Sequence, residues 1–375
     1  MIYNGSSYNE NWEISKLAEL GTFARGVSKH RPRNDPRLFE NGKYPLVQTG
    51  DVKEATLYLS KHEQEYGDFG LKQSKLWNTG TLCITIAANI AETAILAYPM
   101  CFPDSIVGFS AYPEKSSEEF MYYIFEYIKK SIQNAATGSI QDNINLEYLM
   151  SLDFKIPEKK YQDMIVLILS SIDRKILINN AINDNLEQQM HLIFENMMAK
   201  AATHKLSGEY TIAQNLATVV TGKEDANFSV PNGKYKFFTC SNTPLLCDEY
   251  VFDSSSILIA GNGDFNVKHY SGKFNAYQRT YILTPDKKYF GLLYLASLYR
   301  INSFKSRSSG SIVKFITKSD VENIPVFIPN DMFYLQELNK LIYLQEQNKL
   351  ENELLVNLRD WLLPMLMNGQ ATISD

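Results

Sequence analysis

The sequence predicts an α/β (α+β) fold built by tandem duplication: a mixed α/β globular domain followed by a long helix, and then both again. Two observations predict it. A heptad pattern occurs in two stretches that lie 169 residues apart, and short motifs beside them recur 172 residues apart. Heptad spacing indicates a long helix packed against a partner helix. Several motifs that recur at nearly one offset indicate a duplication.

The first heptad stretch covers residues 165–197. It is apolar at both ends and polar in the middle. Such a stretch is long enough for many helical turns, so we expect one continuous helix. Its positions in steps of four and three are Ile165, Leu169, Ile172, Ile176, Asn179, Asn183, Leu186, Met190, Ile193 and Met197.

The second stretch repeats the two asparagines in place. A buried asparagine fixes the register of two helices, because it is satisfied only opposite a matching polar group. We therefore expect an antiparallel coiled coil with pseudo-twofold symmetry within one chain; two unrelated amphipathic helices are the alternative. The second stretch reads Tyr334, Leu338, Leu341, Gln345, Asn348, Asn352, Leu355, Arg359, Leu362 and Leu366. The residues expected in the helix-helix seam are Ile172, Ile176, Asn179, Asn183, Leu341, Gln345, Asn348 and Asn352.

Four segments follow from this pattern. They are a first globular domain at 1–158, a central long helix and linker at 159–204, a second globular domain at 205–330, and a distal long helix and tail at 331–375. The first globular segment carries 15 Lys and Arg against 20 Asp and Glu, whereas the second carries 14 against 10. The second domain is therefore the basic one, although the whole chain has a net charge of −5.

The first domain begins with a loosely attached arm at 1–11, followed by a strand that enters a short helix at 12–20. Residues 21–37 lack a helical period and are rich in Arg, Lys, Gly and Pro, so we expect a basic loop. Alternating or continuous apolar runs predict the later strands. The remaining elements expected are strands at 44–49, 82–87 and 106–109, a turn at 50–51, an amphipathic helix at 120–132, and a short helix to Leu152 with Asn145 as its N-cap.

The second domain repeats this order after a linker at 199–207. A strand and short helix at 210–220 match the opening of the first domain, a buried strand is expected at 256–260, and an amphipathic helix at 289–299. The recurring motifs are Asn41–Tyr44 with Asn232–Tyr235, Gly138–Ile140 with Gly310–Ile312, and Ile156–Pro157 with Ile328–Pro329.

Composition narrows the function classes. The chain start has neither the basic nor the apolar region of a signal peptide, and its most lipid-like run, 164–169, is far too short to span a bilayer. Four cysteines lack the spacing of zinc ligands. We therefore expect a protein of the reducing cytoplasm with no metal of its own and no membrane partner.

The duplicated layout suggests double-stranded DNA as a partner. A helix of about 33 residues is roughly 50 Å long, about the span of 14 base pairs. Paired modules held at a fixed separation suit two half-sites on a duplex, and modules of different sequence suit two different half-sites. In the first domain we expect phosphate contacts from Arg25, Lys29, Arg31 and Arg33, and base-edge contacts from Gln48, Thr49, Asn89 and Gln141.

The second domain has a denser cluster, interleaved with Tyr270, Phe274 and Tyr277. A second basic loop is expected at Lys305 and Arg307. The alternative is that these are solvated loop charges. The residues of the cluster are Lys268, His269, Lys273, Asn275, Gln278 and Arg279.

Catalytic motifs are absent from the sequence. It has no phosphate-binding Gly-rich loop ending in Lys-Ser/Thr and no Asn/Asp-Pro-Pro-Tyr/Phe run typical of amino-methyltransferases. Asp104 and Asp286 each follow a proline and leave a metal-dependent nuclease as an alternative. The five histidines are scattered, so we expect no catalytic residues in this chain.

With these features, the full length of the chain resembles the specificity (S) subunit of a type I restriction-modification system. The stretches that carry the resemblance are Leu362–Gly369, Ile165–Ile176, Thr81–Ile90 and Gly272–Thr280. The first two are similar to the family's helical repeats and the last two to its target-recognition domains. The chain departs from the family at its short proline junctions, and it has Val313 where the first Gly-Ser loop has Gln141.

The resemblance implies a non-catalytic subunit whose two target-recognition domains each read half of a bipartite DNA site. The helices would set the unread gap and bind two methyltransferase (M) subunits, and motor-nuclease (R) subunits would join the assembly. AdoMet, ATP and Mg²⁺ would then belong to the partners. The alternatives are a specificity subunit of another restriction-modification type and a coiled-coil scaffold without a DNA role.

Overall fold

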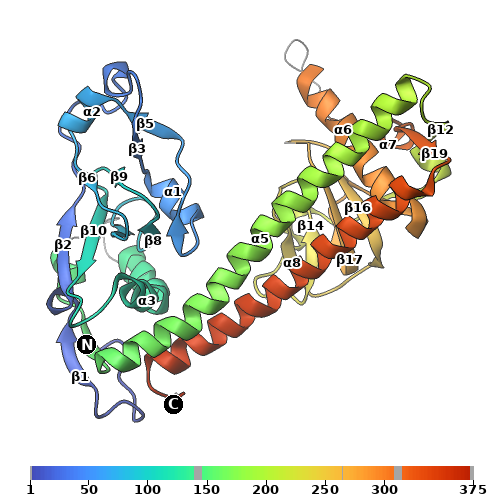
Figure 1. Cartoon of the computed structure of the whole chain (residues 1–375). Coiled ribbons are helices and arrows are strands. Elements are labelled where there is room, and N and C mark those ends of the chain that lie inside the picture. The colour runs from blue at the N-terminus through green and yellow to red at the C-terminus, as the bar shows by residue number, and fades with distance from the viewer. Residues whose placement is uncertain (1, 139–145, 264, 308–314, 372–375) are drawn as a thin grey trace. The chain divides into compact units, whose positions relative to one another are not determined.

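The computed structural model describes residues 2–138, 146–263, 265–307 and 315–371. The chain forms two compact units: Met1–Leu177 with Asn352–Asp375, and Ile178–Glu351. Each unit contains one globular domain and a segment of both long helices, α5 (Lys159–Ala202) and α8 (Met332–Met367). Figure 1 shows α5 in green and α8 in red, side by side within each unit. None of the described helices is long and apolar enough to cross a membrane.

The first unit contains three small sheets. Strands β1 and β11 form an antiparallel pair, a five-stranded sheet has the order β2-β10-β7-β8-β4, and a four-stranded sheet has the order β5-β3-β9-β6. Their bounds are β1 Glu13–Lys16, β2 Gly21–Arg25, β3 Tyr44–Leu46, β4 Tyr58–Leu59, β5 Gln64–Tyr66, β6 Leu76–Trp77, β7 Leu82–Thr85, β8 Thr93–Leu96, β9 Met100–Cys101, β10 Ile106–Ala111 and β11 Asp153–Ile156.

Helix α3 packs on β7, β8 and β10 and buries its apolar stripe there, including Phe120, Tyr123 and Ile124. This is the amphipathic helix expected at 120–132, and it extends from Glu118 to Gly138. The other helices of the unit are η1 (Leu17–Glu19), η2 (Pro36–Leu38), α1 (Thr49–Glu54), α2 (Asp68–Lys72) and α4 (Leu146–Met150). Asn145, the expected N-cap of α4, lies outside the described residues.

Two predictions for this unit are wrong. The turn expected at 50–51 is part of α1, because the Gln48 N–H is capped by the Asp51 carboxylate and the chain continues as helix. The arm at 1–11 is not loosely attached from residue 2 onward. The buried Asn4 side chain donates to the carbonyls of Lys155 (2.8 Å) and Met367 (2.7 Å), which ties this segment to β11 and to the end of α8.

The second unit repeats the arrangement with a larger sheet. Strands β12 and β19 form the antiparallel pair that corresponds to β1 and β11, and a six-stranded sheet has the order β13-β18-β16-β17-β14-β15. The bounds are β12 Gly208–Ile212, η3 Ala213–Asn215, β13 Ala217–Thr221, η4 Ala226–Phe228, β14 Tyr235–Phe238, β15 Leu245–Cys247, β16 Phe252–Ala260, β17 Val267–Ala276, β18 Thr280–Pro285, η5 Lys287–Tyr289, α6 Phe290–Arg307, α7 Lys318–Glu322 and β19 Pro325–Pro329.

Helix α6 covers β16 and β17 and corresponds to α3. Here too the structure corrects two boundaries. Helix α5 continues to Ala202, so the linker expected at 199–207 begins later. Lys305 and Arg307 lie in the last turn of α6 and not in a loop. The repeated Gly-Ser motifs at 138–140 and 310–312 fall largely outside the described residues. The repeated order of elements nevertheless confirms the predicted duplication.

Candidate nucleic-acid interface

The predicted basic loop of the first unit is a loop between β2 and η2, and much of its positive charge is paired within the chain. Arg31 and Arg33 contact Asp104 at 3.7 and 2.6 Å. His30 and Arg37 both contact Asp35 at 2.7 Å. Hydrogen bonds from Arg37, and then from His30, hold the pKa of Asp35 well below its usual range. These contacts fix the shape of the loop.

Arg25 and Lys29 remain available at the edges of this loop. Both are exposed, Arg25 at the end of β2 and Lys29 five residues before η2's cap region. Within the described part of the chain, neither side chain has a hydrogen-bond or ion-pair partner. They are therefore the two cations of this loop that phosphates reach without breaking an internal pair.

The four residues expected to read base edges in the first unit lie in separate places. Gln48 is exposed before α1 and its amide contacts Gln64 at 3.4 Å, while Thr49 begins α1. Asn89 lies in the connection between β7 and β8, where its carbonyl accepts from the Thr85 hydroxyl. Gln141 lies outside the described residues. The described contacts do not bring these side chains into one surface.

The cluster of the second unit is divided by strand β17, since successive side chains of a strand point to opposite faces. His269 lies on the face toward α6 and α8 and is buried. Its ring contacts Gln345 (2.9 Å) and Glu346 (3.0 Å) of α8 and packs against Tyr294 of α6, with ring centroids 4.9 Å apart. His269 thus links the sheet to the long helix and is not placed at the surface.

Glu346 shows the electrical consequence of this link. Burial raises the pKa of its carboxyl, but hydrogen bonds from His269 and Ser271 outweigh burial, so the pKa lies below its usual value. Asn275 is also buried; its amide donates to the Glu249 carbonyl and its oxygen accepts from the Ala276 N–H. These two members of the predicted cluster hold the domain together.

Three other members are exposed. Lys273 lies over the Tyr250 ring at 4.8 Å, and Gln278 donates to Asp225 at 2.9 Å. Arg279 is exposed, and its guanidinium has no hydrogen-bond or ion-pair partner among the described residues. Lys268 is half-buried and donates to the Thr239 and Ser241 carbonyls, and burial lowers its pKa. The side chains of Lys305 and Arg307 are not among those described.

Arg279 borders a groove that the sequence did not reveal. The groove has a volume of about 410 Å³, and its lining includes Gln278, Tyr281, Phe315 and Lys318. Phe315 and Lys318 follow the second Gly-Ser motif and lie about 36 residues beyond Arg279 in the sequence. Only the tertiary structure brings these two segments together, through the bridge between Asn262 and Phe315.

The helix seam is buried at the positions expected for its first six members: Ile172, Ile176, Asn179, Asn183, Leu341 and Gln345. In the second unit, the Asn348 amide donates to the Asn183 side-chain oxygen at 3.0 Å, and the Asn179 amide donates to Glu351 at 2.7 Å. Because partners advance along one helix as they retreat along the other, α5 and α8 run antiparallel here. Asn348 and Asn352 are half-buried.

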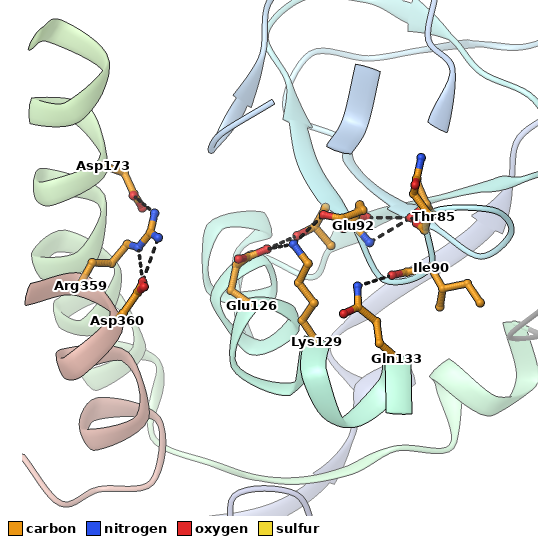
Figure 2. A network of polar contacts seen from close by, with 11 residues as sticks. Thr85, Ile90, Glu92, Glu126, Lys129, Gln133, Asp173, Arg359 and Asp360 are labelled. Atoms are coloured by element: carbon orange, nitrogen blue, oxygen red, sulfur yellow. Dashed lines mark hydrogen bonds and ion pairs between the residues drawn. The ribbon is translucent and has the colours of Figure 1, made fainter. Parts of the chain in front are cut away.

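In the first unit, the same helices are joined by a charged contact. Asp173 of α5 is 3% exposed in its side chain and accepts from Arg359 of α8 at 3.0 Å and from the Tyr123 hydroxyl of α3 at 2.7 Å. Figure 2 shows Arg359 between Asp173 and Asp360. Three elements therefore meet at one buried carboxylate, which fixes the first domain on the helix pair.

A cleft of about 440 Å³ lies beside this contact. Its lining includes Glu126 and Lys129 of α3, and Arg359 and Asp360 of α8. Lys129 also pairs with Glu92, and burial raises the pKa of Glu126 despite that lysine. Figure 2 shows the two polar groups on either side of the cleft.

The nuclease alternative gains no support from the described residues. Asp104 is paired with Arg31 and Arg33, and Asp286 lies between β18 and η5. The described part of the chain has no group of three His, Cys, Asp or Glu side chains arranged to hold a metal ion.

Comparisons with known proteins agree on one family. The family model described as "Type I restriction modification DNA specificity domain" matches residues 9–188 and 216–356. The chain is 35% identical over 164 residues to the type I restriction enzyme EcoDI specificity subunit of Escherichia coli, which covers 42% of this chain and 37% of that relative's length. The fold resembles the crystal structure of the type I restriction-modification system S subunit from M. genitalium, with a TM-score of 0.62 and 17% identity over 100% of both chains.

Proposed function

The chain belongs to the family of type I restriction-modification DNA specificity proteins, and on this premise we propose that each of its two globular domains reads one half of a bipartite site on duplex DNA. The observation that carries the proposal is the duplication itself. Two domains of one topology carry different exposed side chains, Arg25 and Lys29 in the first and Lys273 and Arg279 in the second. Similar domains with different surfaces suit two half-sites of different sequence.

The exposed cations supply affinity and register, and other groups supply selectivity. Lys and Arg contacts to phosphates are insensitive to sequence, whereas contacts to base edges and to DNA shape distinguish sequences. The chain as a whole is acidic, with a net charge of −5. We therefore expect weak binding to DNA by the chain alone and tighter binding once partner subunits add their own contacts.

The long helices set the unread gap in this proposal. Helix α5 has 44 residues and is therefore about 66 Å long. Its pairing with α8 through buried side chains gives it the stiffness that a spacer needs. A duplex rises about 3.4 Å per base pair, so a spacer of this size suits a gap of several base pairs with each half-site beyond it.

We also propose that the outer faces of these helices bind two methyltransferase (M) subunits. Large apolar side chains are exposed there, and on α8 of the first unit Leu354, Leu358 and Trp361 lie at helical spacing on one face. Exposed apolar stripes mark protein-binding surfaces. Motor-nuclease (R) subunits would join through the methyltransferases. Catalysis, AdoMet, ATP and Mg²⁺ are assigned to these partners, and the cytoplasm to the assembly.

The direct test maps methylated adenine across the genome of a host that expresses the partner methyltransferase with and without this chain. The proposal predicts a split motif with a fixed gap that appears only when the chain is present. A coiled-coil scaffold without a DNA role predicts the same methylation in both hosts, and that result would overturn the proposal. A continuous motif without a gap would point to another type of restriction-modification system.

A further inference from the structure

We propose that Phe315 contacts the apolar surface of a base in the half-site read by the second domain, while Arg279 and Lys318 hold the flanking phosphates. The inference rests on the proposed function and assigns a role to a residue that the sequence did not single out. Phe315, Arg279 and Lys318 line one groove of about 410 Å³. All three belong to the same compact unit.

Phe315 is an unusual surface residue. Its side chain is 58% exposed, although phenylalanine is among the residues most often buried. The neighbouring Ile316 is 3% exposed and anchors the segment in the core. An exposed aromatic ring beside a buried anchor is oriented outward by the chain itself, so it is available to a ligand.

The backbone at Phe315 is fixed on both sides. Phe315 forms an isolated antiparallel bridge with Asn262. The Ile316 N–H donates to the Gly261 carbonyl at 2.8 Å, and the Tyr281 hydroxyl donates to the Ile316 carbonyl at 2.8 Å. A ring held on a fixed backbone loses little conformational freedom when it binds, which favours its use as a contact residue.

The charges around the ring favour a polyanion. Arg279 has no hydrogen-bond or ion-pair partner among the residues that the structure describes. Lys318 has only an exposed contact with Glu322 at 3.3 Å, which is easily exchanged for a phosphate. The neighbouring carboxylate of Asp320 is already engaged by Thr317, and that of Asp225 by Gln278. The groove therefore offers cations while its carboxylates are occupied.

The combination points to a base rather than to a phosphate alone. Proteins that read duplex DNA use apolar side chains against the thymine methyl group or as wedges between base steps, with cations beside them on the backbone. A phosphate-only site would gain nothing from an exposed phenyl ring. Gln278 lies in the same lining and adds an amide that can reach a base edge.

The test is a double-mutant cycle between Phe315 and individual bases. It uses the complex of the full chain with its partner methyltransferase and a fluorescent 30-base-pair duplex that carries both half-sites. A set of duplexes has one abasic position each in the second half-site. We expect Phe315→Ala to weaken binding to the intact duplex by about tenfold, the usual cost of one lost base contact. At one position or two adjacent positions, removal of the base should weaken the wild type by a similar factor and the variant hardly at all.

Two controls make the result specific. Tyr210→Ala removes an exposed aromatic ring of the same unit outside the groove and should leave affinity unchanged. Thermal melting of Phe315→Ala checks that the domain is folded. Equal abasic penalties in wild type and variant at every position would overturn the inference, as would an effect of Phe315→Ala on assembly with the methyltransferase and not on DNA. A wild-type complex that ignores the second half-site would instead overturn the proposed function.

Discussion

At the scale of single residues, Arg359 shows how a charge is accommodated inside a helix seam. The heptad pattern places Arg359 where the other repeat has Met190, and it places Asp173 where the other repeat has Ile342. The structure pairs the two charges and adds the Tyr123 hydroxyl as a third partner. A buried pair of this kind contributes little net stability but makes the loss of one partner costly.

This contact gives a prediction about stability. Arg359→Met leaves the Asp173 carboxylate buried without a cation, so the free energy of unfolding should fall by about 3 kcal/mol. Adding Asp173→Asn should recover most of that loss, because the amide is uncharged and its oxygen still accepts from Tyr123. Urea unfolding of both variants measures the difference. An equal loss in the single and double variants would show that the charge of Asp173 is not what makes the arginine necessary.

The structure also separates residues that look alike in the sequence. His269 and Lys273 lie four residues apart in the predicted DNA-binding cluster, yet one faces the long helix and the other is exposed. Whether a residue in a strand points inward depends on the register of the sheet, and β17 has neighbours that come from distant segments. The residue types were therefore predictable, but the division of the cluster between two faces was not.

At the scale of elements, the long helices were predicted most accurately. Their heptads gave the pairing, and the asparagines indicated a polar contact that the structure places between Asn183 and Asn348. Their ends were less accurate, since α5 continues to Ala202 where a linker was expected. Short elements such as α1 depended on a local cap at Asp51 that the sequence pattern did not single out. Periodicity predicts long elements well, and local hydrogen bonds decide short ones.

The link between β17 and α8 predicts a pH dependence. The pKa of Glu346 is lower in the folded state than its ordinary value, so its contact with His269 stabilises the fold above that ordinary value and is lost as the pH falls through the folded-state pKa. The free energy of unfolding should therefore fall more steeply below about pH 4.5 in the wild type than in Glu346→Gln. Denaturant titrations at several pH values measure both slopes. Parallel curves for the two proteins would contradict the assigned role of Glu346.

At the scale of the whole molecule, the duplication joins the fold to the proposed function. The repeated order of strands and helices was visible in motifs 172 residues apart, and the structure confirms it. The surfaces were less predictable. Arg31 and Arg33 are paired with Asp104, and the groove at Arg279 includes Phe315 from a distant segment. Motifs identify the family, whereas the residues available to DNA depend on tertiary contacts.

The central claim is that each domain reads its own half of one site, and charge reversal in one domain at a time tests it most directly. The measurement is genome-wide methylated adenine in hosts that express the partner methyltransferase with either of two variants. One variant carries Arg25→Glu and Lys29→Glu, and the other carries Lys273→Glu and Arg279→Glu; all four side chains are exposed. Reversal turns attraction to phosphates into repulsion, and a matched pair of variants equalises the change in net charge.

The account predicts that each variant relaxes or loses selectivity in one half of the split motif and leaves the other half and the gap unchanged, with different halves affected by the two variants. Loss of the same half in both variants, or an unaltered motif in both, would contradict the assignment of one half-site to each domain.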